Sequence, residues 1–423
     1  MGPIIILDKS AIQSFSTDNL ILLHKYYMPI IVPILTVEIL GDLKKPTKDE
    51  KTEQEVVRAL ARKLMPFDTA FTTFHKELLW GSILGCPVQM DGRPILGGGK
   101  KVKTKEGKRG IVFGMTLEEK ALQRWQEGDF NEAENVLAER WREVSRDQDL
   151  NKVKNDLEKW FGQLPKFSTL KEISKYLDYI LELEANQASL LSLFIYQFGF
   201  EKEGSRIFSN WSEKGSPLLQ EFSPYAIYCL KIALLCQIGM VKHVLGTKAT
   251  NTVDMQYLYY LPFAMVFCSG DKFHSEITPL FLRKNQYFIK ASELKSDLAQ
   301  ISAIGKMPDG TNGDLDFRKL AEKNSITYKI WNERMAYLPG TEKSRTPKED
   351  PTKSAVVDHS TDIMKQIKEE AEAVATDEEF GVDEADFVVR ERTMRTKDFC
   401  LCGSGKLFGD CCYKKIEEKN SKE

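Results

Sequence analysis

The chain begins with an alternation of apolar runs and helical patterns. Residues 4–7 are three isoleucines and a leucine, and Asp8 follows them directly. A β-branched run of this kind is typical of a short buried strand. A helical pattern over residues 16–26 leads to a second apolar run at 30–35, which opens into a helix start at 36–40. The order strand, helix, strand, helix predicts the first part of a parallel sheet.

Between residues 49 and 243 the pattern changes to the period of amphipathic helices. The expected helices are Val56–Leu64, Thr116–Gln126, Phe130–Arg146, Leu150–Phe161, Leu170–Glu184, Gln187–Phe198 and Pro224–His243. Residues 224–241 are long and apolar enough to span a membrane, but Lys231 lies in their middle and no anchoring residues flank them. We therefore expect a buried helix within an all-helical insertion and no membrane segment.

The sheet pattern resumes after residue 243. A helix is expected from Asp254 to Leu261, a strand at 264–268 and a further strand at 287–289. The sequence thus predicts an α/β protein whose parallel-sheet core is interrupted by a large all-α insertion and followed by a small metal-binding tail. The expected boundaries are 1–48 and 244–340 for the two parts of the core, 49–243 for the insertion, 341–397 for an acidic flexible linker and 398–415 for the tail.

The overall charge of the chain is too close to neutral to attract nucleic acid electrostatically. The chain has 60 basic and 62 acidic residues and a net charge of −2, so a polyanion could be bound only by a local basic patch. The one strong candidate is the run from Lys100 to Arg109, which follows several glycines. It either neutralises several phosphates of a nucleic acid or forms a solvated loop.

Four acidic residues occupy comparable positions in this pattern. Asp8, Glu38 and Asp271 each lie at or just beyond the end of an apolar strand, and Asp254 begins the helix before the strand that ends at Asp271. A parallel sheet gathers such positions at one edge. Clustered carboxylates raise each other's pKa unless a cation neutralises them, and Mg²⁺ or Mn²⁺ prefers oxygen ligands. The alternative is a set of helix caps and turn residues on an inactive sheet.

These residues resemble the metal site of the PIN-domain nucleases. The matching motifs are Asp8-Lys9-Ser10, Glu38 after the second strand, Asp254 on a helix, and Ser269-Gly270-Asp271. The resemblance implies that Asp8, Glu38, Asp254 and Asp271 are catalytic ligands of Mg²⁺ or Mn²⁺, supported by the cofactor-binding hydroxyls of Ser10 and Ser269. It also implies hydrolysis of RNA to a 5′-phosphate and a 3′-hydroxyl. The long insertion departs from the family pattern.

The resemblance leaves two functions open. One is a metal-dependent nuclease, with ribonuclease activity as the implied reaction and nucleic acid as the partner. The other is a catalytically inactive PIN-like protein that binds partners through its helical region and its tail. His274, three residues after Asp271, is either a phosphate contact or a turn histidine without a catalytic task.

The last 24 residues contain four of the eight cysteines, namely Cys400, Cys402, Cys411 and Cys412. Two thiolates one residue apart and two adjacent thiolates beyond a Gly-rich turn can close a tetrahedral Zn²⁺ site. The segment resembles the SEC-C motif, which implies a recruiting module for a protein or ribosome-associated partner. Concentrated cysteines indicate a metal site inside the cell rather than a disulfide framework, so we expect a cytoplasmic protein.

Overall fold

The fold is known from a computed structural model of the chain. It describes residues 2–47, 51–64, 69–97, 99–103, 109–146, 149–304 and 325–334. The chain divides into two units, residues 1–97 with 116–335 and residues 98–115 with 336–423, and each is considered by itself. The expected linker at 341–397 and the cysteine tail at 398–415 lie outside the described residues.

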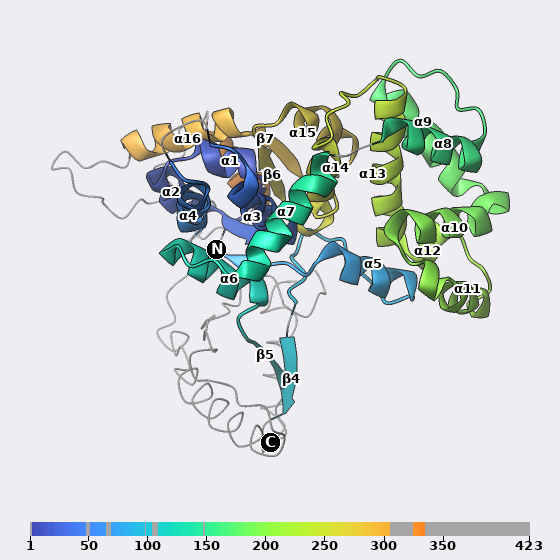
Figure 1. The fold of residues 1–423 in the computed structure, drawn as a ribbon, viewed down its shortest axis with the longest axis horizontal. Helices are drawn as coiled ribbons and strands as arrows, with labels where there is room; N and C mark the ends of the chain where they lie inside the picture. Colours follow the sequence, from blue (N-terminus) through green and yellow to red (C-terminus); the bar gives the residue numbers. More distant parts are fainter. Residues whose placement is uncertain are drawn as a thin grey trace, which may run out of the picture. The chain divides into compact units, whose positions relative to one another are not determined.

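The first unit is a mixed α/β structure built on a five-stranded parallel sheet, which confirms the predicted α/β class and parallel sheet (Figure 1). The strand order is β3-β2-β1-β6-β7. The strands are β1 (Ile4–Leu7), β2 (Met28–Ile31), β3 (Ala70–Phe71), β6 (Val266–Ser269) and β7 (Tyr287–Lys290). In the register, Ile6 of β1 is the partner of Ile30 on one side and of Phe267 on the other. The two distant segments with sheet patterns therefore form one sheet, with β1 at its centre.

Two features of the sheet differ from the sequence prediction. Strand β3 extends the sheet and comes from the segment that was expected to be all-helical. A strand of two residues is too short to show the alternation of apolar and polar positions that predicts strands. The second strand ends at Ile31, because Pro33 is the first residue of α3 (Pro33–Leu40). Proline has no N–H for the strand ladder and is well suited to the first helical turn. Glu38 consequently lies within a helix rather than at the end of a strand.

Helices surround the sheet and fill the long middle segment. Those close to the sheet in sequence or by contact are α1 (Lys9–Ser14), α2 (Thr17–Tyr26), α3, η1 (Gly41–Lys44), α4 (Glu53–Lys63), α14 (Asn251–Leu258), η5 (Leu261–Phe263), α15 (Lys272–Ile277), η6 (Thr278–Leu280), α16 (Ala291–Ile304) and α17 (Ile326–Arg334). The middle segment contains α5 (His75–Ile83), α6 (Leu117–Glu127), α7 (Glu132–Arg146), α8 (Leu150–Phe161), α9 (Leu170–Glu182), η3 (Glu184–Asn186), α10 (Gln187–Phe198), η4 (Glu201–Glu203), α11 (Gly204–Glu213), α12 (Leu219–Phe222) and α13 (Pro224–Val241).

Helix α13 is the core of the helical region. It packs against α5, α8, α9 and α14, and most of its side chains are buried. Among the described residues it is the one helix long and apolar enough to cross a membrane, but its burial is that of a core helix. Lys231, in its middle, is paired with Asp178 of α9 at 2.5 Å, so the charge that interrupts the apolar run has a partner.

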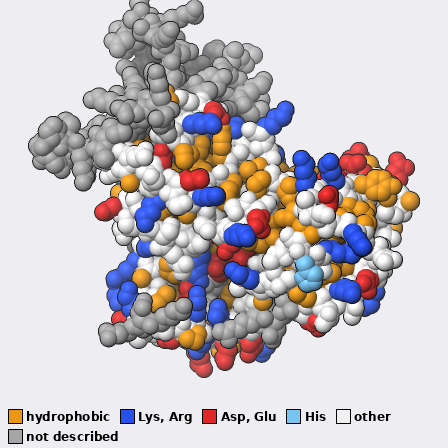
Figure 2. All heavy atoms as spheres, turned by 90° about the horizontal axis from the view of Figure 1, so that it is seen from above, with side chains coloured by type: hydrophobic (Ala, Val, Ile, Leu, Met, Phe, Trp, Pro, Cys, Tyr) orange, Lys and Arg blue, Asp and Glu red, His pale blue; other side chains and the backbone are white. Residues whose placement is uncertain are grey.

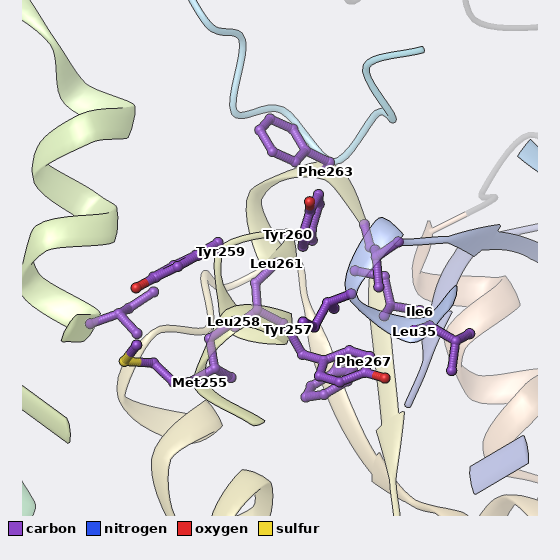
Figure 3. Packing of buried hydrophobic residues seen from close by; sticks show 14 of the residues in the cluster. Ile6, Leu35, Met255, Tyr257, Leu258, Tyr259, Tyr260, Leu261, Phe263 and Phe267 are labelled. Carbon is purple, nitrogen blue, oxygen red and sulfur yellow. The ribbon is translucent and has the colours of Figure 1, made fainter. Parts of the chain in front are cut away.

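An aromatic segment joins α14 to the sheet (Figure 3). Tyr257, at the end of α14, is fully buried and stacks on Phe267 of β6 with ring centroids 6.4 Å apart. Tyr260 is also fully buried and accepts a hydrogen bond from the backbone N–H of His75. These contacts hold α14, which carries Asp254, close to the strand that precedes Asp271.

The described part of the second unit is a small ribbon. Strands β4 (Gly99–Lys103) and β5 (Arg109–Phe113) pair in antiparallel fashion and form a two-stranded sheet of their own. These strands also fall within the segment that was expected to be helical. The basic run identified in the sequence therefore forms a β-ribbon over its described residues.

Candidate acidic site at the sheet edge

Asp8 is the most completely bonded carboxylate at the sheet edge. It follows the central strand β1, caps the N-terminus of α1 and is only 3% exposed. Its Oδ1 accepts the backbone N–H of Ala11 at 2.8 Å, and the Ser10 hydroxyl lies 2.8 Å from both carboxylate oxygens. The Ser269 hydroxyl donates to Oδ2 at 2.6 Å. A buried carboxylate needs such donors, because removal from water otherwise disfavours its charge.

The two serines connect Asp8 to the turn that follows β6. The backbone N–H of Gly270 donates to the Ser10 hydroxyl at 2.8 Å, and that of Asp271 donates to the Ser269 hydroxyl at 2.9 Å. An added Cβ at Gly270 would lie 3.1 Å from the Ser10 oxygen, so glycine permits this close approach. The Asp8-Lys9-Ser10 motif follows β1, and the Ser269-Gly270-Asp271 motif lies at the end of β6. Although they are far apart in the sequence, hydrogen bonds join them into one unit.

His274 completes this unit through contacts at both of its ring nitrogens. Its Nε2 donates to the backbone carbonyl of Asp254 at 2.9 Å, and its Nδ1 lies 2.8 Å from the Ser269 hydroxyl and 3.2 Å from Asp8 Oδ2. The Ser269 hydroxyl lies within hydrogen-bond distance of both Asp8 Oδ2 and Nδ1, and a protonated Nδ1 donates to either neighbour. In that protonation state the ring donates from both nitrogens, as an imidazolium does.

The pKa values agree with an internal ion pair. Burial alone would raise the pKa of Asp8, but the hydrogen bond and charge of His274, together with Ser269 and Ala11, hold it below its usual value. Burial likewise would lower the pKa of His274, but the hydrogen bond and charge of Asp8 raise it. His274 is therefore neither a plain turn residue nor a free phosphate contact in this structure.

Glu38 occupies the other half of the edge. Its Oε2 accepts the Tyr257 hydroxyl at 2.7 Å. Lys9 Nζ lies 3.9 Å from Oε1 and donates to the Glu38 backbone carbonyl at 3.1 Å, while its closest partner is Asp42 at 2.8 Å. The pKa of Glu38 is raised, mainly by burial, although Lys9 and Tyr257 oppose the shift. Lys9 is therefore shared between the carboxylates of Asp42 and Glu38, and it neutralises the negative charge of Glu38 only in part.

Asp254 is the carboxylate whose negative charge is least stabilised by neighbouring groups among the four acidic residues. It lies in the first turn of α14 and is partly buried. Burial raises its pKa to about 7; the charge of His274 opposes the shift, and the nearby charges of Glu38, Asp271 and Asp8 add to it. Within the described residues no hydrogen bond to its carboxylate is found. Its backbone carbonyl, by contrast, is fixed by His274.

Asp271 caps α15 and is partly buried. Its Oδ1 accepts the backbone N–H of Phe273 at 2.7 Å. The same side chain raises the pKa of Asp254 through its charge. The four predicted acidic residues are therefore close enough to affect one another, as their positions in the sequence indicated.

The donor set suits a hard divalent cation in its chemistry, since carboxylate and hydroxyl oxygens are the ligands of Mg²⁺ and Mn²⁺. The charge left on Glu38 and Asp254 is the kind that such an ion neutralises. Across the described part of the chain, however, no three His, Cys, Asp or Glu side chains are grouped so that they could hold a metal ion. The oxygens of Asp8 are instead engaged by internal donors.

Three members of the site were not singled out from the sequence. Lys9 and Asp42 form a buried ion pair, and Tyr257 holds Glu38. Lys9 is part of the first motif, and Tyr257 is one helical turn after Asp254, so the sequence positions of both residues could have pointed to the site. The sequence position of Asp42, in η1, gives no such indication. The four predicted zinc ligands, Cys400, Cys402, Cys411 and Cys412, lie outside the described residues.

Comparison with models of known protein families, with curated proteins and with solved structures finds no match of any of the three kinds.

Proposed function

We propose that the acidic edge hydrolyses phosphodiester bonds with the help of Mg²⁺ or Mn²⁺, as an endoribonuclease with a PIN-like core. One observation carries the proposal. The carboxylates of Asp8, Glu38, Asp254 and Asp271 come from separate segments and lie near one edge of a parallel sheet, close enough for their charges to act on each other's pKa. Ligands of open α/β sheets bind at this edge.

A bound divalent cation would polarise the phosphate and lower the pKa of the attacking water. The residues that would hold it are Asp8, Glu38, Asp254 and Asp271. Ser10 and Ser269 orient Asp8 through the hydrogen bonds described above. Tyr257 and Lys9 orient Glu38. A carboxyl group with a pKa of about 7, such as that of Asp254, can gain or lose a proton near neutral pH.

The test is cleavage of a fluorescent single-stranded RNA in Mn²⁺, with EDTA as the blank. The wild type should cut the RNA, and Asp8→Asn and Asp271→Asn should each lose at least a hundredfold in rate. The matched control is Asp149→Asn, which changes an exposed helix cap on α8. Equal rates in the wild type and both site variants would refute the proposal.

A second candidate function is a non-catalytic binding protein on the same fold. The specific observation in its favour is that Asp8 is engaged from within the protein, since His274 Nδ1 lies 3.2 Å from its Oδ2 and Ser269 donates to the same oxygen. This candidate predicts no cleavage in any divalent cation and unchanged partner binding in Asp8→Asn. The same assay therefore separates the two functions.

The cysteine tail is proposed to hold one Zn²⁺ and to recruit a protein or ribosome-associated partner in the cytoplasm. The support is the spacing of Cys400, Cys402, Cys411 and Cys412 alone. Metal analysis of the purified protein should give one zinc per chain. A Cys400→Ser, Cys402→Ser double variant should give none, and an unchanged zinc content would contradict the assignment.

A further inference from the structure

Lys9 is a buried cation that lies between two carboxylates. Its Nζ is 2.8 Å from Asp42 Oδ1 and 3.9 Å from Glu38 Oε1, and it donates to the Glu38 backbone carbonyl at 3.1 Å. A separation of 3.9 Å is longer than a hydrogen bond. Of the two carboxylates near this ammonium, Asp42 is therefore bonded to it directly and Glu38 Oε1 is not.

Burial distinguishes this pair from the charges on the surface. On the face of the molecule drawn in Figure 2, basic and acidic side chains are interspersed, and exposed pairs of opposite charge contribute little to stability. The side chains of Lys9 and Asp42 are only 10% and 4% exposed. Because apolar side chains can often replace a buried ion pair without a loss of stability, stability alone does not explain why this pair is present.

The backbone that carries Asp42 is fixed by the helical region. Asp42 lies in η1 directly after Gly41, and α7 packs against η1. A Cβ added at Gly41 would lie 2.7 Å from Cδ1 of Trp141, a residue of α7. Since there is no room for a Cβ, α7 fits closely against η1 and holds Asp42 beside Lys9.

Glu38 is held differently from Asp42. Tyr257 donates to its Oε2 at 2.7 Å, whereas the described residues place no hydrogen-bond donor on its Oε1, to which Lys9 is the nearest cation. The side chain of Glu38 is 23% exposed, against 4% for Asp42. Glu38 is thus the one of the two carboxylates that a cation from the solvent can reach.

We propose that Asp42 is a positioning residue of the acidic edge. By pairing with Lys9 it keeps the ammonium away from Glu38 Oε1, and this oxygen stays available to a divalent cation. Without the charge of Asp42, the flexible side chain of Lys9 would turn to Glu38, because a buried ammonium needs a charged partner. The role of Oε1 rests on the proposed function, whereas the competition of the two carboxylates for Lys9 requires no metal ion.

The competition is tested without metal, by urea denaturation of the full chain in EDTA at pH 7. In the wild-type background, Glu38→Gln removes a carboxylate that Lys9 neutralises only in part, so the urea midpoint should not fall. In the Asp42→Asn background, the same substitution removes the last carboxylate beside Lys9, so the midpoint should fall. Equal changes in the two backgrounds would overturn the inference, because Lys9 would then not have turned to Glu38.

The consequence for the cation is measured as Mn²⁺ affinity, from the electron paramagnetic resonance signal of free Mn²⁺. Asp42→Asn should bind Mn²⁺ roughly tenfold to a hundredfold more weakly than the wild type, as is usual when a residue that orients a metal ligand is lost. Lys9→Met, Asp42→Asn should recover the wild-type affinity, because no ammonium is left to occupy Glu38. The matched control is Asp178→Asn, which removes the partner of Lys231 in the helical region and should bind like the wild type.

Two results of the Mn²⁺ titration would overturn the inference. They are wild-type affinity in Asp42→Asn, and an equal loss in Asp42→Asn and in Lys9→Met, Asp42→Asn. A wild type that binds no Mn²⁺ would refute the proposed function and the role assigned to Glu38 Oε1, and the urea midpoints in EDTA would still decide whether Asp42 holds Lys9 away from Glu38. Melting temperatures check that all variants are folded.

Discussion

Asp8 and Asp254 lie at the same edge of the same sheet and have opposite electrostatic properties. Asp8 is the more deeply buried, yet its pKa lies below the usual value because the hydrogen bond and charge of His274, the Ser269 hydroxyl and the Ala11 N–H together outweigh the effect of burial. Asp254 is only partly buried and its pKa is raised to about 7. Burial therefore does not decide the charge of a carboxylate here; the number of donors around it does.

The difference divides the acidic edge into two halves. The half around Asp8 is satisfied by the protein itself and joins β1 to the turn after β6. In the half with Glu38 and Asp254, Lys9 is closer to Asp42 than to Glu38, and the charge of His274 only partly offsets the raised pKa of Asp254. The first half is a structural unit, and the second half is where an external cation has most to gain.

The largest effect should come from removing the cation of the second half. Lys9→Met leaves Asp42 buried without its ion pair, which should lower the free energy of unfolding by about 3 kcal/mol. Urea denaturation at pH 7 measures the loss. The double variant Lys9→Met, Asp42→Leu should recover most of it, because both charges are then absent. A single variant as stable as the wild type would show that the pair is not formed.

The second-largest effect should come from a substitution beside Asp8, in the half of the acidic edge that the protein itself satisfies. Ser269→Ala removes a hydrogen bond from a hydroxyl to the buried Asp8 carboxylate and one acceptor of His274. Bonds to charged groups are worth about 1.5 to 3 kcal/mol, so a loss of about 2 kcal/mol is expected by urea denaturation. Ser192→Ala, at a half-buried position of α10 whose hydroxyl bonds only the Ala188 carbonyl of its own helix, is the control and should change stability by less than about 0.5 kcal/mol. Equal losses would contradict the special role of Ser269.

A substitution in the second half should stabilise the protein instead. The folded pKa of Asp254 is about 7, above its ordinary value of 3.8, so the folded state binds the proton more tightly and stability falls as the pH rises from about 4 to about 7. Asp254→Asn removes this cost. The full shift corresponds to about 4 kcal/mol, but solvent screens a partly exposed group, so we expect a gain of about 1 to 2 kcal/mol at pH 8 and little change at pH 4.

Thermal denaturation of Asp254→Asn and the wild type across this pH range checks the sign. His274 contributes in the same direction, because its raised pKa stabilises the folded state below the unfolded value of 6.5 and that contribution is lost as the pH rises through the folded pKa. The charge of Asp254 is one cause of that raised pKa, so the difference curve contains the titration of Asp254 together with its coupling to His274. A variant less stable than the wild type at pH 8 would contradict the assignment.

The smallest effect concerns the contact between the two motifs. Gly270→Ala places a Cβ 3.1 Å from the Ser10 hydroxyl oxygen, so the serine must shift by a few tenths of an ångström. We expect a loss of about 1 kcal/mol or less, measured by urea denaturation. The loss should be smaller in a Ser10→Ala background. If the two losses simply add, Ser10 and Gly270 are not in contact as described.

The sequence was informative where short apolar runs ended at acidic residues. Strands β1 and β6 were expected from such runs, and their parallel arrangement brought Asp8 and Asp271 together. Strand β7 and the helix that carries Asp254 were expected from their own apolar patterns. Strand β3 could not be expected, since two residues have no period. Glu38 was placed at a strand end because the apolar run continued through Pro33, which in fact begins a helix.

The internal partners of the carboxylates were harder to predict. Lys9, Asp42 and Tyr257 reach the site from three different segments, and no local pattern states which lysine or tyrosine will be buried beside a given acid. His274 was expected to be either a phosphate contact or a turn histidine without a catalytic task. Its role follows from the tertiary position of the Asp254 carbonyl and the Ser269 hydroxyl, which depends on how α14 packs against β6.

The central claim is that the acidic edge binds a divalent cation, and the most direct test is thermal denaturation in increasing Mn²⁺. A ligand of the folded state at a hundredfold excess over its dissociation constant adds about 2.7 kcal/mol of stability. We predict a Mn²⁺-dependent rise in the melting temperature of the wild type that disappears in the Asp8→Asn, Asp271→Asn double variant and persists in Asp149→Asn. A wild type whose melting temperature does not respond to Mn²⁺, or a double variant that responds equally, would contradict the claim.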